Sequence, residues 1–184
     1  MPHVAGIAPP GSLGPGFEEP FGMLHACHER VERMLALLQK LRSHMRESGA
    51  DEQVRQATRD IMRYFDKAAP QHHLDEELHV FPVLVGTQDE GLVRLVARLQ
   101  RDHQQMSAQW VAVRSLLEEV ESGQRTRFND TDDAVLDAFA NLYADHLQAE
   151  EESAYPHASA GIGAERLKAM SADMMARRGV TAPR

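Results

Sequence analysis

The sequence has one cysteine, an excess of acidic over basic residues and no long apolar run, and each shortage excludes a class of protein. The single cysteine, Cys27, rules out an internal disulfide and is typical of a reducing compartment. The formal net charge of −8 leaves no basic stripe to displace counterions from phosphates, so we expect neither a nucleic-acid partner nor an anionic-membrane partner. No apolar run approaches the ~20 residues that span a bilayer, so we expect no membrane-spanning segment. A cytoplasmic location is the default expectation.

Aromatic residues are also scarce, at 5% of the chain, and the Val/Ile/Thr alternation typical of strands is nowhere sustained. Leu, Ala, Met, Glu and Arg are abundant instead, which favours an all-α protein. With 184 residues, 42% of them apolar, the chain is long enough to bury one sizeable core.

Apolar side chains recur every three or four residues in four long stretches, at 21–38, 54–83, 92–120 and 135–153. Because the connections are short, these stretches predict an up-down-up-down four-helix bundle over residues 21–160. The Gly/Pro-rich residues 1–20 predict an irregular N-terminal arm. Residues 161–184 predict a tail with a short amphipathic helix near 165–178, packed outside the bundle.

Two stretches of the chain repeat one polar phrase. Residues 72–82 read HHLDEELHVFP and residues 146–156 read HLQAEEESAYP, and both fit H-x-x-x-E-E-x-x-x-(F/Y)-P. Each phrase closes on an aromatic residue and a proline, so Pro156 predicts a disrupted end to the fourth helix. Pro70 predicts a kink in the second helix, through which the apolar spacing continues.

Each apolar stripe carries one histidine where Leu or Val would ordinarily stand: His28, His72, His103 and His146. A lone histidine on an apolar face is ordinarily a hydrogen-bonded core residue, but one on every helix needs a common explanation. About 20 residues separate His28 from the end of its helix, and about 20 separate the start of the next helix from His72. Because the rise per residue is constant, the two histidines lie at the same height in the bundle. Between His72 and His103 the chain runs about 13 residues to the end of the second helix and about 13 back along the third. Between His103 and His146 it runs about 18 residues to the end of the third helix and about 15 back along the fourth. We therefore expect all these imidazoles in one layer of the bundle.

Two glutamates join this layer, because Glu76 and Glu150 each follow a histidine by four residues on the same helix face. Unpaired buried charge is costly, and a pair of metal ions would offset it, each bound by two histidines with both glutamates bridging. An N/O ligand set without thiolates suits Fe, Mn or Zn, and bridged pairs in bundle cores point first to iron. The predicted ligands are His28, His72, Glu76, His103, His146 and Glu150.

The sequence also offers a second register, because His73 and Glu77 have the same spacing as His72 and Glu76. Aligning the two phrases on their prolines decides against it, since His73 then matches Leu147. We therefore interpret His73, Glu77 and Glu151 as residues that flank the ligands.

The remaining chemically active side chains have simpler interpretations. His25 and His79 lie one turn from predicted ligands, beside the site or an access channel, and His3, His44 and His157 are predicted at the surface. Cys27 fits a small buried helix residue better than a redox thiol. Trp110 and the methionines on the stripes fit core packing.

The order His28, His72-x-x-x-Glu76, His103, His146-x-x-x-Glu150, with EELHVFP and EEESAYP closing the even helices, resembles the hemerythrin-like cation-binding domains over about residues 21 to 160. The resemblance implies a non-haem di-iron centre with a bridging oxo or hydroxo ligand inside a four-helix bundle. It also implies that the bound partner is a small diatomic molecule or peroxide.

The chain departs from the oxygen-carrying members of that family in two places. Those proteins have a second histidine four residues along the third helix, where this chain has Ser107, and an aspartate one residue beyond the position of Glu150. The resulting set of histidines and glutamates resembles the subgroup that includes the bacterial repair-of-iron-centres proteins. The cysteine-containing N-terminal segment of those proteins is absent, because Cys27 lies inside the first helix.

This resemblance implies about five ligands on each iron and an open position on both. Two open irons favour reaction with O2, NO or peroxide over reversible carriage. An iron- or gas-sensing or iron-handling module without turnover remains the alternative, so the sequence leaves open whether the protein is an enzyme. A ferritin-like site is disfavoured, because only Glu76 with His79 gives the E-x-x-H pair and Gln100 and Tyr143 stand in the matching places. A metal-free bundle would leave the repeated phrase to coincidence.

Overall fold

The computed structural model describes residues 16–181, and these residues form helices and turns with no strand. The first bundle helix is α1 (Pro20–Ser48) and the third is α5 (Glu90–Glu121). The second is one continuous run of five segments: α2 (Glu52–Arg63), η1 (Tyr64–Ala68), α3 (Ala69–Asp75), η2 (Glu76–Val80) and α4 (Phe81–Gly86). The fourth is a run of three: α6 (Asp130–Ala149), η3 (Glu150–Ala154) and α7 (Tyr155–Gly161). A short helix follows, α8 (Ala164–Arg177).

Side-chain caps fix where three of the long helices begin. Asp51 accepts a hydrogen bond from the backbone N–H of Val54 at the start of α2, and Asp89 accepts one from Leu92 at the start of α5. Asn129 and Asp132 form a reciprocal capping box at the start of α6. These caps therefore fix the first residues of α2, α5 and α6.

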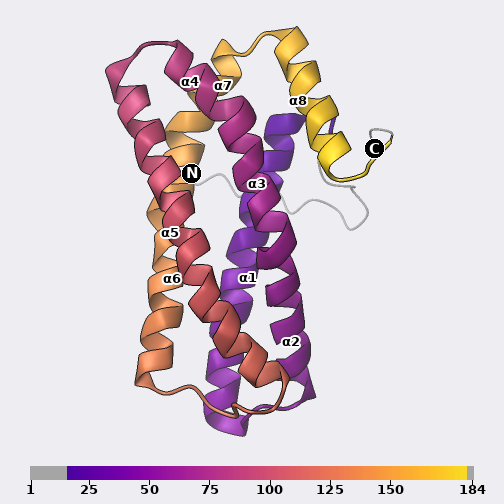
Figure 1. Ribbon diagram of the computed structural model, residues 1–184, viewed down its shortest axis with the longest axis vertical. Coiled ribbons are helices and arrows are strands. Elements are labelled where there is room, and N and C mark those ends of the chain that lie inside the picture. The colour runs from indigo at the N-terminus through magenta and orange to yellow at the C-terminus, as the bar shows by residue number, and fades with distance from the viewer. Residues whose placement is uncertain (1–15, 182–184) are drawn as a thin grey trace, which may run out of the picture.

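The helices stand antiparallel in sequence order, which confirms the predicted up-down-up-down bundle (Figure 1). The fifth helix, α8, lies outside the bundle against α1 and α3, also as predicted. No helix within residues 16–181 is long and apolar enough to cross a membrane. His3 and most of the predicted arm, residues 1–15, lie outside the described residues.

Three π-helical turns interrupt the even helices, and each one directly precedes an Xaa-Pro pair. The residue before the proline (Ala69, Phe81 or Tyr155) donates its N–H to the carbonyl five residues back, that of Tyr64, Glu76 or Glu150 respectively. A proline ring ordinarily clashes with the carbonyl four residues before it, and the wider turn moves that carbonyl aside.

The predicted disruption at Pro156 takes the form of the π-turn η3, after which the fourth helix continues through this residue to Gly161. The prediction that Pro70 does not end the second helix is confirmed, because α3 continues to Asp75. The π-turns also have a positional consequence: η2 begins at Glu76 and η3 begins at Glu150. Both predicted carboxylate ligands thus lie where the helix widens, a placement typical of functional sites.

The apolar core has two parts, separated by a polar layer. The larger part includes Val31, Phe65, Met106, Phe139 and Leu147, and the smaller includes Leu24, Val80, Leu99, Ala154 and Met174. On every bundle helix a predicted histidine lies between a residue of one part and a residue of the other. The polar layer is therefore enclosed by apolar packing at both ends, which keeps bulk water from it.

Candidate metal centre

The structure brings the six predicted ligand side chains together, and all are almost completely buried: His28, His72, Glu76, His103, His146 and Glu150. The imidazole rings form two pairs, with 4.8 Å between the centroids of His28 and His72 and 4.9 Å between those of His103 and His146. Similar helix lengths on either side of each connection bring the rings close to one level, as the residue counts predict.

Each glutamate lies between the two histidine pairs. One oxygen of Glu76 is 3.3 Å from Nε2 of His72, and the other is 3.4 Å from Nε2 of His103. Glu150 likewise lies between the pairs, with one oxygen 3.1 Å from Nε2 of His146 on its own helix and the other 3.2 Å from Nε2 of His28 in the other half of the bundle. Each carboxylate therefore offers one oxygen to each side of the layer.

Several of these atoms lack the hydrogen-bond partners that burial requires. Among the described residues, the buried atoms without a partner include Nε2 of His103 and His146, Oε2 of Glu76 and both carboxylate oxygens of Glu150. They are close together but not aligned to bond with one another, an arrangement that costs free energy unless something else satisfies them. Nitrogen and oxygen lone pairs that converge in this way fit metal cations.

The charge balance of the layer also favours a cation. Burial on its own lowers the pKa of His28, but the nearby carboxylates of Glu150 and Glu76 outweigh it and raise this pKa to about 10. The same balance raises the pKa of His103 to about 10. Burial and the charge of Glu76 raise the pKa of Glu150, yet the histidine rings close to its two oxygens dominate and bring it to about 2. The carboxylates thus attract positive charge, as protons on imidazole or as a metal ion.

The second glutamate of each phrase contacts a histidine from the other half of the bundle. Nδ1–H of His28 donates to Glu151 at 2.6 Å, and Nδ1–H of His103 donates to Glu77 at 3.0 Å. These contacts direct Nε2 of each ring toward the layer. The structure therefore places Glu77 and Glu151 beside the layer, where the alignment of the phrases predicts them.

Asp102 has a supporting contact that the sequence analysis missed. Its carboxylate lies 3.4 Å from Nδ1 of His146. In the other half of the bundle the position that matches Asp102 is occupied by Cys27, because Cys27 directly precedes His28 as Asp102 directly precedes His103. Nδ1 of His72 is among the buried atoms without a partner. The supporting contacts of the two halves therefore differ at this position.

Tyr155 is a further residue of the layer that the sequence pattern does not reveal, because its place in the phrase indicates only a helix stop. Its phenol O–H donates to Oε1 of Glu76, and its oxygen lies 2.9 Å from Nε2 of His28. The side chain is 1% exposed, so this hydroxyl is part of the buried layer. The one available signal was the difference between Phe81 and Tyr155 at matching places of the repeated phrase.

The remaining histidines of interest lie outside the six-residue cluster. His73 stacks on the ring of His103 with 4.0 Å between centroids, and Nδ1 of His25 lies 2.5 Å from Glu151. Both therefore border the layer, as expected for flanking residues. His79 instead pairs with Asp173 of α8 at 2.7 Å, because η2 rotates the residues that follow Glu76. The expectation that His79 lies beside the site is corrected accordingly.

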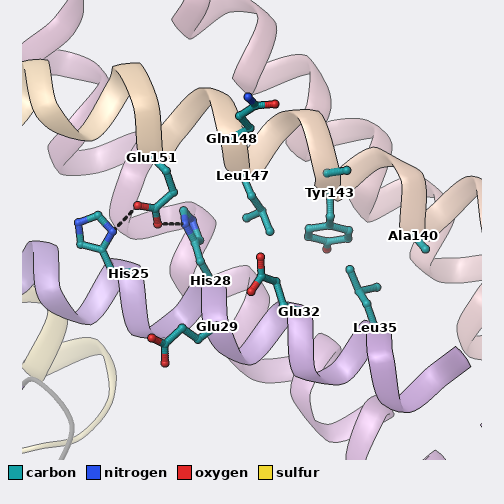
Figure 2. Close-up of a pocket in the computed structure, with 11 residues that line it drawn as sticks. His25, His28, Glu29, Glu32, Leu35, Ala140, Tyr143, Leu147, Gln148 and Glu151 are labelled. Carbon is teal, nitrogen blue, oxygen red and sulfur yellow. Dashed lines mark hydrogen bonds and ion pairs between the residues drawn. The ribbon is translucent and has the colours of Figure 1, made fainter. Parts of the chain in front are cut away.

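An open groove between α1 and α6 leads toward the layer (Figure 2). It encloses about 670 Å³ and is lined by His25, His28, Glu32, Tyr143, Leu147 and Glu151, among others. Glu151 lies at one end of the groove and contacts both His25 and His28 there (Figure 2). Small solutes can therefore approach one side of the cluster through this groove.

Comparison with known proteins agrees with this geometry. A protein from Haemophilus influenzae described as "Uncharacterized protein" is 34% identical over 164 residues, which cover 89% of this chain and 92% of that protein. The family model for the hemerythrin HHE cation binding domain matches residues 19–158, a span that contains all six clustered side chains. The chain therefore belongs to the hemerythrin HHE cation-binding domain family.

Proposed function

We propose that this protein is a non-haem di-iron protein that binds or reacts with O2, NO or peroxide. His28 and His72 would hold one ion, His103 and His146 the other, and Glu76 and Glu150 would bridge them. The observation that carries the proposal is the placement of the two carboxylates, each with one oxygen toward each histidine pair. A single ion would leave several of these buried donor atoms without a partner.

The donor types support iron as the metal. Imidazole nitrogens and carboxylate oxygens without thiolate suit Fe, Mn and Zn, and paired carboxylate bridges inside helix bundles are typical of di-iron sites. The family is one of cation-binding domains, which agrees with a metal in this layer. Iron bound here would supply one-electron chemistry with small oxidants, which side chains alone do not provide.

The chain's own residues would control which molecules reach that chemistry. The layer lies between two apolar core regions, so bulky or strongly solvated molecules are excluded. The groove between α1 and α6 reaches His28 and admits small solutes. Glu151 and Glu77 hold the outer nitrogens of His28 and His103, and so keep both rings in place as the bound ligand changes.

The test is spectroscopic and kinetic. Protein loaded with iron should hold about two irons per chain and show near-ultraviolet and visible bands that azide or peroxide alters. It should also consume peroxide or NO faster than an equal concentration of free iron. Metal-free protein purified from iron-replete cells, or bands that azide and peroxide leave unchanged, would contradict the proposal.

A second candidate, a sensing or iron-handling module without turnover, is favoured by one observation. Asp75 directly precedes the predicted ligand Glu76, is fully buried, and pairs with Arg177 and Arg178 at the end of α8. Loss of a metal ion from Glu76 would therefore alter the ion pairs that hold α8 against the bundle. Iron removal that frees α8, in a protein with negligible peroxide consumption, would favour this candidate over the first.

A further inference from the structure

Tyr155 makes the two halves of the polar layer chemically different. Its ring is held among aromatic neighbours, with centroids 5.1 Å from His28 in a stacked arrangement and 6.1 Å from Phe21 edge-on. Proximity of its oxygen to His28 and Glu76 follows from this packing and from η3, which ends immediately before it. The hydroxyl is therefore fixed inside the cluster.

The spacing of the phenol oxygen matches that of the predicted ligand atoms. Two neighbouring ligand atoms on one metal ion, each at ~2.1 Å from it, lie about 3 Å apart. The Tyr155 oxygen is 2.9 Å from Nε2 of His28, while Oε2 of Glu150 is 3.2 Å from the same nitrogen. A hydrogen bond has the same length, so in the metal-free chain a proton can stand where an ion would be bound.

Among the described residues, the matching place in the other half of the layer offers no such oxygen. Phe81 takes the matching place in the repeated phrase, and its ring lies over His103 with 5.6 Å between centroids. Two similar ring-on-histidine contacts thus differ by one hydroxyl, that of Tyr155. Any ion bound by His103 and His146 lacks this possible donor.

We propose that Tyr155 binds the ion held by His28 and His72 through its phenolic oxygen. The inference rests on the proposed metal site and goes further in naming a ligand and an asymmetry. On binding, the O–H bond breaks, the proton leaves to water, and the oxygen lone pair bonds to the metal with no electron transferred. The open position for a small oxidant is then on the ion of His103 and His146, where Phe81 provides no oxygen and a second groove, lined by Asp102, Asp145 and His146 among others, gives access from that side.

The experiment uses the full chain loaded with ferric iron. A phenolate bound to ferric iron gives a visible charge-transfer band, and resonance Raman excitation within it enhances tyrosine ring vibrations. The wild type should show these vibrations, and growth on ring-deuterated tyrosine should shift them. Since the chain contains three tyrosines, Tyr64→Phe and Tyr143→Phe should keep the band, whereas Tyr155→Phe should lose it while retaining most of its iron.

The Tyr155→Phe variant is expected to fold, because phenylalanine already fills the matching place at position 81. The deuteration result does not depend on any variant, and the Tyr64 and Tyr143 variants identify the source of the band by elimination. Ultraviolet difference absorption of tyrosinate on Zn²⁺ addition provides the same comparison without iron. Bound metal with no tyrosine vibrations overturns this inference and leaves the proposed function standing, whereas a chain that binds no metal overturns both.

Discussion

The carboxylate of Glu77 on the second bundle helix lies 3.0 Å from Nδ1 of His103 on the third, although the adjacent Glu76 points into the buried layer. Glu151 has the same relation to His28 in the other half of the bundle. The doubled glutamate of each phrase therefore has two tasks. The first glutamate faces the layer and the second fixes a histidine from the other half.

This division of tasks predicts that Glu76→Ala and Glu77→Ala differ sharply. Glu76→Ala removes a bridging carboxylate and should reduce bound iron from about two per chain to one or none. Glu77→Ala should keep its iron in excess metal but weaken affinity by ~10–100-fold, because it removes only an orienting contact. Metal analysis after dialysis against a graded chelator measures both. Unchanged iron in Glu76→Ala with loss in Glu77→Ala would reverse the assignment.

Metal removal should lower the stability of the bundle. Ions that bind only the folded chain add about 3 kcal/mol at a free concentration ~100 times Kd. Chelation should therefore lower the melting temperature followed by circular dichroism, and re-addition of iron should restore it. A double variant, Glu76→Ala with Glu150→Ala, serves as the control, and its melting temperature should not respond to chelator. An equal response in both proteins would mean that the stabilising ion binds elsewhere.

The contact between Asp75 and α8 should hold that helix in place. Asp75→Asn removes the negative charge that Arg177 and Arg178 share, and hydrogen bonds to charged groups contribute ~1.5–3 kcal/mol each. Hydrogen exchange should become faster across α8 while the backbone amides of α5 keep their protection. Glu165→Gln, an exposed change at the start of the same helix, is the matched control and should leave exchange unchanged. Faster exchange throughout the bundle would show that Asp75 supports the core rather than α8.

The far end of the bundle should show a pH dependence of its own. Burial raises the pKa of Asp133, but hydrogen bonds from Arg46 and Arg42 outweigh it and hold the pKa below its ordinary value. The folded-state pKa is lower than the unfolded one, so this stabilisation is full above pH ~4 and is lost as pH falls through the folded-state value.

Asp133→Asn should accordingly cost about 2 kcal/mol at pH 7, and its difference from wild type should shrink below pH 4. Urea denaturation across this range measures it, with exposed Glu47→Gln as the control that changes little at either pH. A difference between Asp133→Asn and wild type that persists unchanged into strong acid would assign the loss to packing instead of charge.

The position of the buried polar layer could be predicted because helix geometry is regular. A constant rise per residue converts similar counts on either side of a turn into similar heights, which is why His28, His72, His103 and His146 meet. The repeat also selected His72 over His73 as the inward residue, since only one register aligns both phrases. The six clustered side chains could therefore be predicted from the spacing and the repeat in the sequence.

The departures from regular geometry were not predictable in the same way. The π-turns before Pro70, Pro82 and Pro156 add a residue to the local turn, which moved His79 toward α8 and let the fourth helix continue to Gly161. The direction of the Tyr155 hydroxyl depends on that same shift. Contacts between residues far apart in the chain have no periodic signal, so the pairing of His146 with Asp102 was also missed.

Whether these six side chains hold a pair of ions is tested by the amount of iron that the purified chain binds under competition with a chelator, measured together with Glu150→Ala. A di-iron layer predicts about two irons per wild-type chain, bound with strong affinity, and a loss of at least one in the variant. A wild-type chain that binds no iron, or a variant that binds as much as wild type, would contradict it.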